Sequence, residues 1–192
     1  MTVEEKCQVV LEKVVLPEPR KRRTEEEIAQ QCPWAATGHS KGRKPNVVTS
    51  LELDSAIMEK NNERFQRTYR EIEKNEVRYK AYHTEDAEYL MVAFGSVARI
   101  CLKAIEDARE EGIKVGLIRP ITLWPFPYDA IAEVAENCKG VLVVELNAGQ
   151  MVEDVRLAVN GEAAVEHYGR TGGVLFTPEE VLQALKDKLI KK

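Results

Sequence analysis

The chain has 192 residues, of which 44% are hydrophobic, and 32 acidic against 28 basic side chains give a net charge of −4. A negatively charged chain with one short basic cluster is unsuited to binding nucleic acid. No apolar run approaches the roughly 18 residues that a membrane-spanning helix needs, and the first residues lack the apolar core of a signal peptide. The sequence therefore predicts a cytoplasmic protein with one compact domain and no contact with nucleic acid or membrane.

Residues 1–50 are more polar than the rest of the chain and predict an extended arm. Thr24, followed by Glu27 three positions later, forms a capping box, which predicts a short helix over Glu25–Gln31. The loop Trp34–Pro45 contains glycine and proline, and a loop of this length is uncommon inside a compact domain. We expect this arm to lie along a partner.

Residues 51–85 carry the pattern of one long amphipathic helix. Four of its apolar positions recur every seven residues and two further tyrosines join them: Met58, Phe65, Ile72 and Tyr79, with Tyr69 and Tyr82. Only one position per heptad is regularly apolar, so a self-standing coiled coil is not expected. The helix is instead expected to dock along a flat surface of this domain or of another subunit.

Residues 89–120 predict a strand, a helix and a second strand. Leu90–Phe94 is an almost unbroken apolar run, as in strands that are covered on both faces of a parallel sheet. Ser96 stands where an N-cap is expected, and apolar residues then recur at helical spacing until Gly112 ends the helix. Val115–Ile118 forms the second strand, so the segment is a right-handed βαβ unit.

The alternation of strands and helices continues to the C-terminus. Gly140–Leu146 predicts a third strand and Ala163–Tyr168 a fourth, with helices before, between and after them. The last helix begins at Thr177, where an N-cap precedes a proline and a glutamate at the third helical position. Residues 86–192 are therefore expected to form an α/β domain with an open, mostly parallel, Rossmann-like sheet.

The switch point of this sheet is the candidate ligand site. It falls between the loops that follow the first and third strands, which hold the candidate residues Gly95, Ser96, Asn147, Gly149 and Gln150. An anionic ligand would face helix N-termini there. Because no dinucleotide-binding or phosphate-binding glycine motif is present, the alternative is that Ser96 caps a helix and Gly149 serves a turn.

No catalytic or metal site is predicted from the sequence. The histidines show no ligand spacing to one another or to a cysteine, and the four cysteines are scattered without a C-x-x-C pair. Cys101 and Cys138 fall on apolar helix faces, where free cysteine behaves as a small hydrophobe. The chain alone is therefore expected to bind no metal ion and no iron–sulfur cluster.

The connection after the second strand is rich in proline and aromatic residues. Trp124 and Phe126 lie within it, and large rings on a rigid loop favour a contact surface. The alternative is that both rings fold back onto helices of this domain. We predict that Trp124, Phe126 and Arg119, with the turn Asn147–Gln150, form an interface toward another domain or subunit.

Three strings resemble the alpha subunit of 2-oxoacid:ferredoxin oxidoreductases: AEYLMVAFGSVAR, AREEGIKVGLIRPITLWPFP and GVLVVELNAGQMVEDVRLAV. The resemblance extends from Leu16 to about Leu189. Within that family, CPWAATG and NVVTSLELDSAIMEKNNERFQRTYREIE are most similar to the branched-chain enzyme. That enzyme acts on 2-oxoisovalerate, also called 3-methyl-2-oxobutanoate, rather than on pyruvate or 2-oxoglutarate.

The resemblance implies a reaction and a set of cofactors. Enzymes of this family oxidatively decarboxylate a 2-oxoacid on thiamine diphosphate with magnesium, pass electrons through iron–sulfur clusters to ferredoxin, and release an acyl-CoA. This chain looks like the second domain of the alpha subunit, which is similar to the transketolase C-terminal domain, preceded by the end of the first domain. The resemblance implies a homo- or hetero-oligomer in which other chains hold thiamine diphosphate and the clusters, and a domain that binds no cofactor and is inactive alone.

Two alternatives stay open on the sequence. In the first, the chain is a small module that binds a nucleotide or coenzyme A in the switch-point crevice. In the second, it is the corresponding domain of a transketolase-like or branched-chain dehydrogenase and docks a lipoyl carrier, against which the strings GLIRP and ELNAGQM argue.

Overall fold

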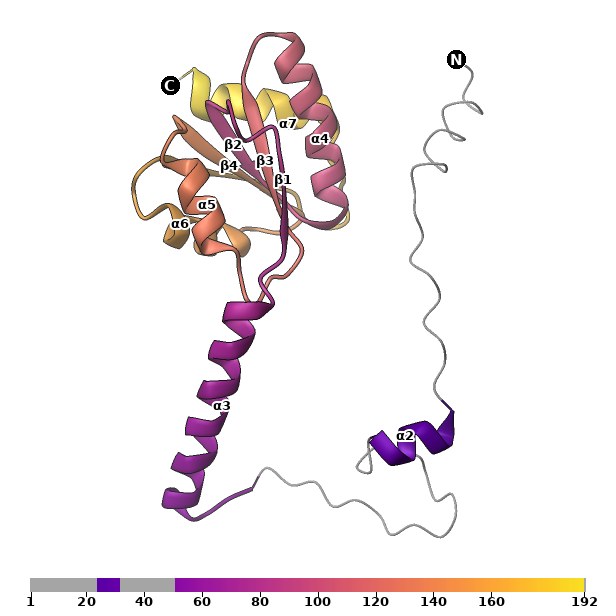
Figure 1. Ribbon diagram of the computed structural model, residues 1–192. Coiled ribbons are helices and arrows are strands. Elements are labelled where there is room, and N and C mark those ends of the chain that lie inside the picture. The colour runs from indigo at the N-terminus through magenta and orange to yellow at the C-terminus, as the bar shows by residue number, and fades with distance from the viewer. Residues whose placement is uncertain (1–23, 32–50, 192) are drawn as a thin grey trace. The chain divides into compact units, whose positions relative to one another are not determined.

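The computed structural model describes residues 24–31 and 51–191 (Figure 1). The chain divides into two units, residues 1–53 and 54–192. In the first unit, α2 spans Glu25–Gln31 as predicted. The Thr24 hydroxyl accepts a hydrogen bond from the Glu27 amide at 3.2 Å, and the Thr24 amide donates to the Glu27 carboxylate at 2.8 Å. The predicted loop Trp34–Pro45 lies outside the described residues.

In the second unit, the strands form one sheet in the order β1-β3-β2-β4-β5. Neighbouring strands from β2 to β5 pair in parallel, and β1 pairs antiparallel with β3 at one edge. The strand bounds are β1 Tyr79–Tyr82, β2 Tyr89–Val92, β3 Val115–Pro120, β4 Gly140–Glu145 and β5 Ala164–Gly169. The prediction of an open, mostly parallel sheet is confirmed.

Helices cover both faces of this sheet (Figure 1). Their bounds are α4 Gly95–Glu110, α5 Tyr128–Ala135, α6 Met151–Val159 and α7 Pro178–Leu185. Residues of α4 and α7 pack with Met91 and Leu142 in one buried cluster, and residues of α5 and α6 pack with Val92 and Val143 in the other. Successive strand residues thus point into different cores, which explains why β2 and β4 are apolar without alternation.

The end of α4 and the start of α7 agree with the sequence, whereas the start of α4 does not. Gly112 follows α4 with φ +81°, and Thr177 caps α7, its hydroxyl accepting from the Glu180 amide at 3.2 Å. The N-cap of α4, however, is Phe94, and no side chain caps that helix. The prediction that Ser96 is the cap is wrong, because Gly95 at φ +60° turns the chain into the helix before Ser96 is reached.

The amphipathic helix α3 spans Ser55–Asn75, so the prediction of a helix through residue 85 is wrong beyond Asn75. The residues that follow belong to the sheet. Arg78 donates its amide to the Thr122 hydroxyl at 2.9 Å and its carbonyl accepts from the Ile121 amide at 2.9 Å, and Tyr79 then pairs with Pro120. These long-range backbone hydrogen bonds outweigh the helical periodicity that Tyr79 continued. None of the described helices is long and apolar enough to cross a bilayer.

Candidate functional site

The topology places the switch point where the sequence predicted it. β2 lies between β3 and β4, so the connections that leave β2 and β4 diverge to opposite sides. Gly95 and Ser96 follow β2, whereas Asn147, Gly149 and Gln150 follow β4. All five candidates therefore lie at one side of the sheet. We call this side the carboxyl edge. It comprises residues 93–96 at the start of α4, the loops 121–127, 146–150 and 170–176, and residues 77–79 at the start of antiparallel β1.

Glu145, the last residue of β4, occupies the N-terminus of α6. Its side chain is buried, with 1% exposed. One carboxylate oxygen accepts from the Met151 amide at 2.8 Å, and the other accepts from the amides of Val152 at 3.1 Å and Gln150 at 3.3 Å. A carboxylate at a helix N-terminus satisfies unpaired amides and interacts favourably with the helix dipole. The position that would bind an anionic ligand is thus already filled by the chain itself.

Asn147 and Gly149 shape the turn between β4 and α6. The Asn147 side-chain amide donates to the Glu145 carboxylate at 3.1 Å, and its carbonyl oxygen accepts from the Gly149 amide at 2.7 Å. Gly149 has φ +108°, which disfavours any residue with a Cβ. These contacts support the alternative in which the turn residues serve the turn. The sequence interpretation missed that Glu145 organises it, although a single glutamate closing the apolar run GVLVV was a signal for this role.

The end of β5 packs tightly against this turn. The Arg170 amide donates to the Glu145 carbonyl at 3.2 Å. His167 Nε2 lies 3.6 Å from the Glu145 carboxylate and is buried without a hydrogen-bond partner among the described residues. A Cβ at Gly169 would lie 2.2 Å from the Asn147 carbonyl oxygen. Gly169 therefore allows the backbone of β5 to approach the turn.

Replacing Gly169 by alanine is expected to lower the free energy of unfolding by about 1–3 kcal/mol, because the new methyl group forces the 145–150 turn to move. Urea unfolding followed by circular dichroism measures the loss. A matched control, Ala164→Ser at the exposed start of the same strand, should leave the free energy unchanged. Equal unfolding midpoints for wild type and Gly169→Ala would contradict the close approach.

The crevice at the switch point is small. A hollow of about 160 Å³ is lined by Phe94, Leu123, Glu145, Asn147 and Gln150, among others. Pockets for drug-sized ligands and cofactors span roughly 300–1,000 Å³. Gly95 and Ser96 are exposed beside it, at an α4 N-terminus without a side-chain cap. The hollow is too small to enclose a nucleotide or coenzyme A.

The two aromatic residues of the 121–127 loop differ in burial. Trp124 is 55% exposed and contacts Tyr69 of α3 edge-on, with ring centroids 5.6 Å apart. Phe126 is 5% exposed and packs in the core beside Tyr128, 5.1 Å between centroids. The Phe126 ring therefore folds back onto the domain, as in the alternative, whereas the Trp124 ring is largely exposed. Arg119 is half-buried, and its Nε has no hydrogen-bond partner among the described residues.

Exposed large apolar side chains gather along the carboxyl edge. The β3–α5 connection presents Ile121, Leu123 and Trp124, each more than half exposed. The other loops of this edge contribute Leu146, Val174 and Leu175, and the start of β1 contributes Val77 and Tyr79. Several exposed large apolar side chains at one end of a sheet are typical of a surface that contacts another polypeptide.

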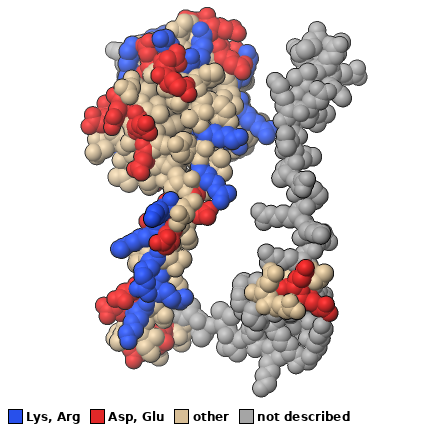
Figure 2. All heavy atoms as spheres, in the orientation of Figure 1, with Lys and Arg blue, Asp and Glu red and all other residues tan. Residues whose placement is uncertain are grey.

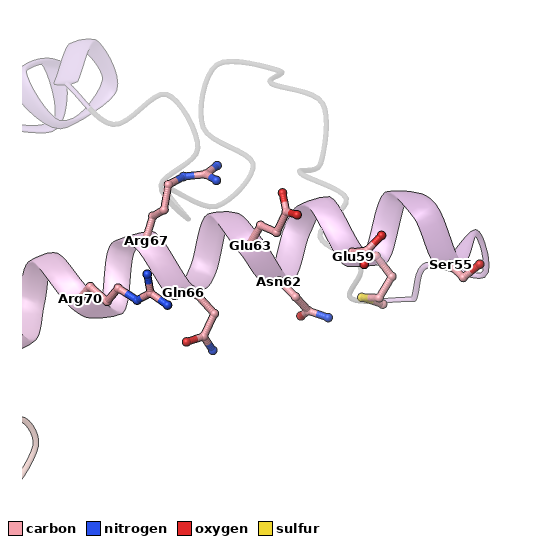
Figure 3. A pocket seen from close by; sticks show the side chains of 8 residues that line it. Ser55, Glu59, Asn62, Glu63, Gln66, Arg67 and Arg70 are labelled. Carbon is pink, nitrogen blue, oxygen red and sulfur yellow. The ribbon is translucent and has the colours of Figure 1, made fainter.

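Helix α3 adds a second exposed surface. It has 21 residues and buries none of them within the described structure. Ile57, Phe65 and Tyr69 are 42–47% exposed, and Met58 and Ile72 are half-buried. Charged side chains of both signs line the helix (Figure 2). Figure 3 shows a polar row on α3, in which Glu59, Glu63, Arg67 and Arg70 project from successive turns, alternating with Asn62 and Gln66. A helix with one partly apolar stripe and little of it covered is typical of a surface that packs on another polypeptide.

Residues 87–181, from the segment before β2 into α7, match the sequence profile of the family described as pyruvate:ferredoxin oxidoreductase core domain II. The α/β domain belongs to this family. Core domain II thus includes the switch point and the Glu145 turn, whereas α3 and β1 lie before the matched residues.

Relatives of core domain II are found in longer proteins. Ketoisovalerate oxidoreductase subunit VorB of Methanothermobacter thermautotrophicus is 46% identical over 154 residues, which cover 80% of this chain and 43% of that protein. 2-Oxoglutarate synthase subunit KorA of Methanothermobacter marburgensis is 38% identical over 102 residues, covering 53% of this chain and 27% of that protein. The chain therefore spans less than half the length of these relatives.

A solved structure shares the fold of core domain II. The structure of 2-oxoglutarate:ferredoxin oxidoreductase from Magnetococcus marinus, with 2-oxoglutarate, coenzyme A and succinyl-CoA bound, superposes with a TM-score of 0.61 at 23% identity. The match covers 81% of this chain and 28% of that one. The predicted family and fold class are confirmed.

The described part of core domain II offers no set of residues for a metal, a cluster or a diphosphate. No group of three or more histidine, cysteine or acidic side chains converges there. Cys101 and Cys138 are buried, and burial raises the pKa of the Cys101 thiol to about 12. The α6 N-terminus holds the Glu145 carboxylate instead of a phosphate. These residues do not fit thiamine diphosphate or an iron–sulfur cluster.

Proposed function

We propose that the chain is part of the alpha subunit of a 2-oxoacid:ferredoxin oxidoreductase that acts on 2-oxoisovalerate and forms an acyl-CoA and reduced ferredoxin. The proposal is supported by the relatives. The ketoisovalerate subunit is 46% identical over 154 residues, and the similarity extends into the segments before the family match. The 2-oxoglutarate subunit is 38% identical over 102 residues.

Within this enzyme, we infer that core domain II holds neighbouring domains or subunits together and takes no part in the chemistry. The properties of the carboxyl edge support this inference. Its helix N-terminus at α6 is filled by Glu145, its hollow is small, and its loops present exposed apolar side chains such as Leu123 and Trp124. An edge of this kind suits contact with another polypeptide better than binding of a charged cofactor.

The cofactors of the whole enzyme then belong to other parts of the assembly. We propose that thiamine diphosphate with magnesium and the iron–sulfur clusters are held by the remaining domains and chains, with coenzyme A as co-substrate and ferredoxin as electron acceptor. A cytoplasmic location remains part of the proposal. The alternative of a nucleotide-binding or coenzyme A-binding module has less support, because the α6 N-terminus is filled.

We expect the enzyme that contains this chain, purified anaerobically from its source, to reduce ferredoxin with 2-oxoisovalerate and coenzyme A. Its kcat/KM with 2-oxoisovalerate should be at least about tenfold above that with 2-oxoglutarate or pyruvate, since a pocket for a branched apolar chain discriminates by roughly 1–3 kcal/mol. Initial rates of ferredoxin reduction measure this. A preference for 2-oxoglutarate would overturn the substrate assignment.

The isolated chain provides the matching control. It should catalyse no turnover, and isothermal titration with coenzyme A or thiamine diphosphate should give no heat above that of dilution. Saturable binding of coenzyme A by the isolated chain would favour the binding-module alternative over the interface role.

A further inference from the structure

A groove of about 780 Å³ lies where α3 meets core domain II. One wall is the last turn of α3 and the start of β1, with Glu73 and Tyr79. The other is the loop around Trp124 and the first turns of α5, with Asp129 and Glu133. In Figure 1 this is the junction below the sheet, where α3 leads into β1. The groove is several times larger than the hollow at the switch point.

The floor of this groove is aromatic and apolar. Trp124 is 55% exposed, Tyr79 is 43% exposed and Val77 is 38% exposed. Leaving such side chains in water forfeits roughly 25 cal/mol per Å² of apolar surface that could be buried. Because Trp124 also belongs to the carboxyl edge, the groove is continuous with the surface that we assign to a partner.

The rim of the groove carries more negative than positive charge. Glu73, Asp129 and Glu133 line it, against a single basic residue, Lys74. Within the described part of the chain, none of these three carboxylates forms an ion pair, whereas Glu76, Glu88 and Glu153 elsewhere on the domain do. The groove therefore lacks the positive charge that would complement it.

We propose that this groove accepts an arginine side chain of a partner polypeptide, with apolar side chains of that partner lying on the carboxyl edge. The inference rests on the proposed function, because it names the chemistry of the partner at that interface. A guanidinium group stacks on the faces of Trp and Tyr and binds carboxylates through two parallel N–H donors. An ammonium group makes only point contacts, so lysine suits the groove less well. Tryptophan, tyrosine and arginine are also the residues that dominate binding energy at interfaces.

The test measures association of the full-length chain with the remaining subunits of its complex. The double variant Glu73→Gln with Glu133→Gln removes two rim charges and keeps the side-chain shapes. We expect its dissociation constant to rise about 10- to 100-fold at 100 mM salt, and its dependence on salt concentration to become weaker. The matched control is Glu136→Gln, an exposed residue just past the end of α5 that does not line the groove, and it should bind as wild type does.

Trp124→Ala separates failure of this inference from failure of the interface itself. If Trp124→Ala weakens association while the double variant binds as wild type does, the proposal of a partner arginine is overturned, but the proposal of an interface at this surface is retained. If neither variant weakens association, both are overturned. A photo-crosslinking residue at Ala130, which also lines the groove, gives a second measurement. Mass spectrometry should identify a crosslinked partner peptide that contains arginine, and a peptide without arginine would overturn the proposal.

Discussion

Replacing Glu145 by glutamine is expected to lower the free energy of unfolding by about 2–4 kcal/mol, since the change leaves buried amides facing a group that no longer accepts all their hydrogen bonds. Three backbone amides of the α6 N-terminus donate to the two carboxylate oxygens. In glutamine one of these oxygens becomes an NH₂ group, which is itself a donor. The new donor would face the amide of Met151 or those of Gln150 and Val152, whichever way the side chain is turned. Urea unfolding monitored by far-UV circular dichroism measures the loss.

Glu153→Gln is the matched control for this prediction. Glu153 lies in the first turn of the same helix, but its side chain is 71% exposed and pairs with Arg156 on the surface at 2.7 Å. Surface ion pairs contribute little to stability, so this variant should unfold with the midpoint of wild type. A second outcome concerns the turn itself: backbone amides 147–152 should exchange hydrogen faster in Glu145→Gln. Unchanged exchange together with an unchanged midpoint would show that Glu145 does not hold the turn.

The sequence predicted the fold where local signals and tertiary structure agree. The capping boxes at Thr24 and Thr177 place the first turns of α2 and α7 correctly, because each box closes within four residues. The apolar run before Gly95 identifies a central strand, since both faces of β2 are covered by helices. These elements can be predicted from the sequence because the local residue pattern and the burial of the side chains agree.

The sequence predictions fail where a contact between residues far apart in the chain determines the local structure. Tyr79 continues a seven-residue repeat, yet it belongs to β1 because the adjacent Arg78 bonds to Ile121 and Thr122 in the connection after β3. A partner 44 positions away leaves no trace in the local pattern. Ser96 is a favoured capping residue, but the chain enters α4 at Gly95, so the N-cap is Phe94, two positions before Ser96.

The candidate site was located by topology, but its chemistry was not predictable from residue types. A glutamate at the carboxyl end of a parallel strand is compatible with catalysis, ligand binding or an internal cap. The distinction depends on whether its carboxylate faces a cavity or backbone amides. In the structure, Glu145 is 1% exposed and bonded to Met151 and Val152, so the internal cap is the role supported.

Phe126→Ala is expected to lower the free energy of unfolding of the domain by about 3–5 kcal/mol, because it removes a buried ring and leaves a cavity between helices. The Phe126 ring is 5% exposed and packs in the cluster that contains Ile131 and Val155. Thermal unfolding of the chain measures the effect. Because Phe126 is only 5% exposed, most of any weakening of assembly in this variant should follow from unfolding and should disappear at temperatures where the domain stays folded.

Trp124→Ala is expected to weaken assembly and to leave the stability of the domain nearly unchanged. Its ring is 55% exposed and its edge contact with Tyr69 is a single aromatic pair, so the melting temperature should change little. Association with the remaining subunits should weaken about 100-fold, in the range found for central aromatic residues of interfaces. Analytical ultracentrifugation at fixed protein concentration measures the change. The two residues stand two positions apart on one loop, so each variant is the control for the other. A large loss of stability in Trp124→Ala with unchanged assembly would reverse the assignment and place the interface away from the carboxyl edge.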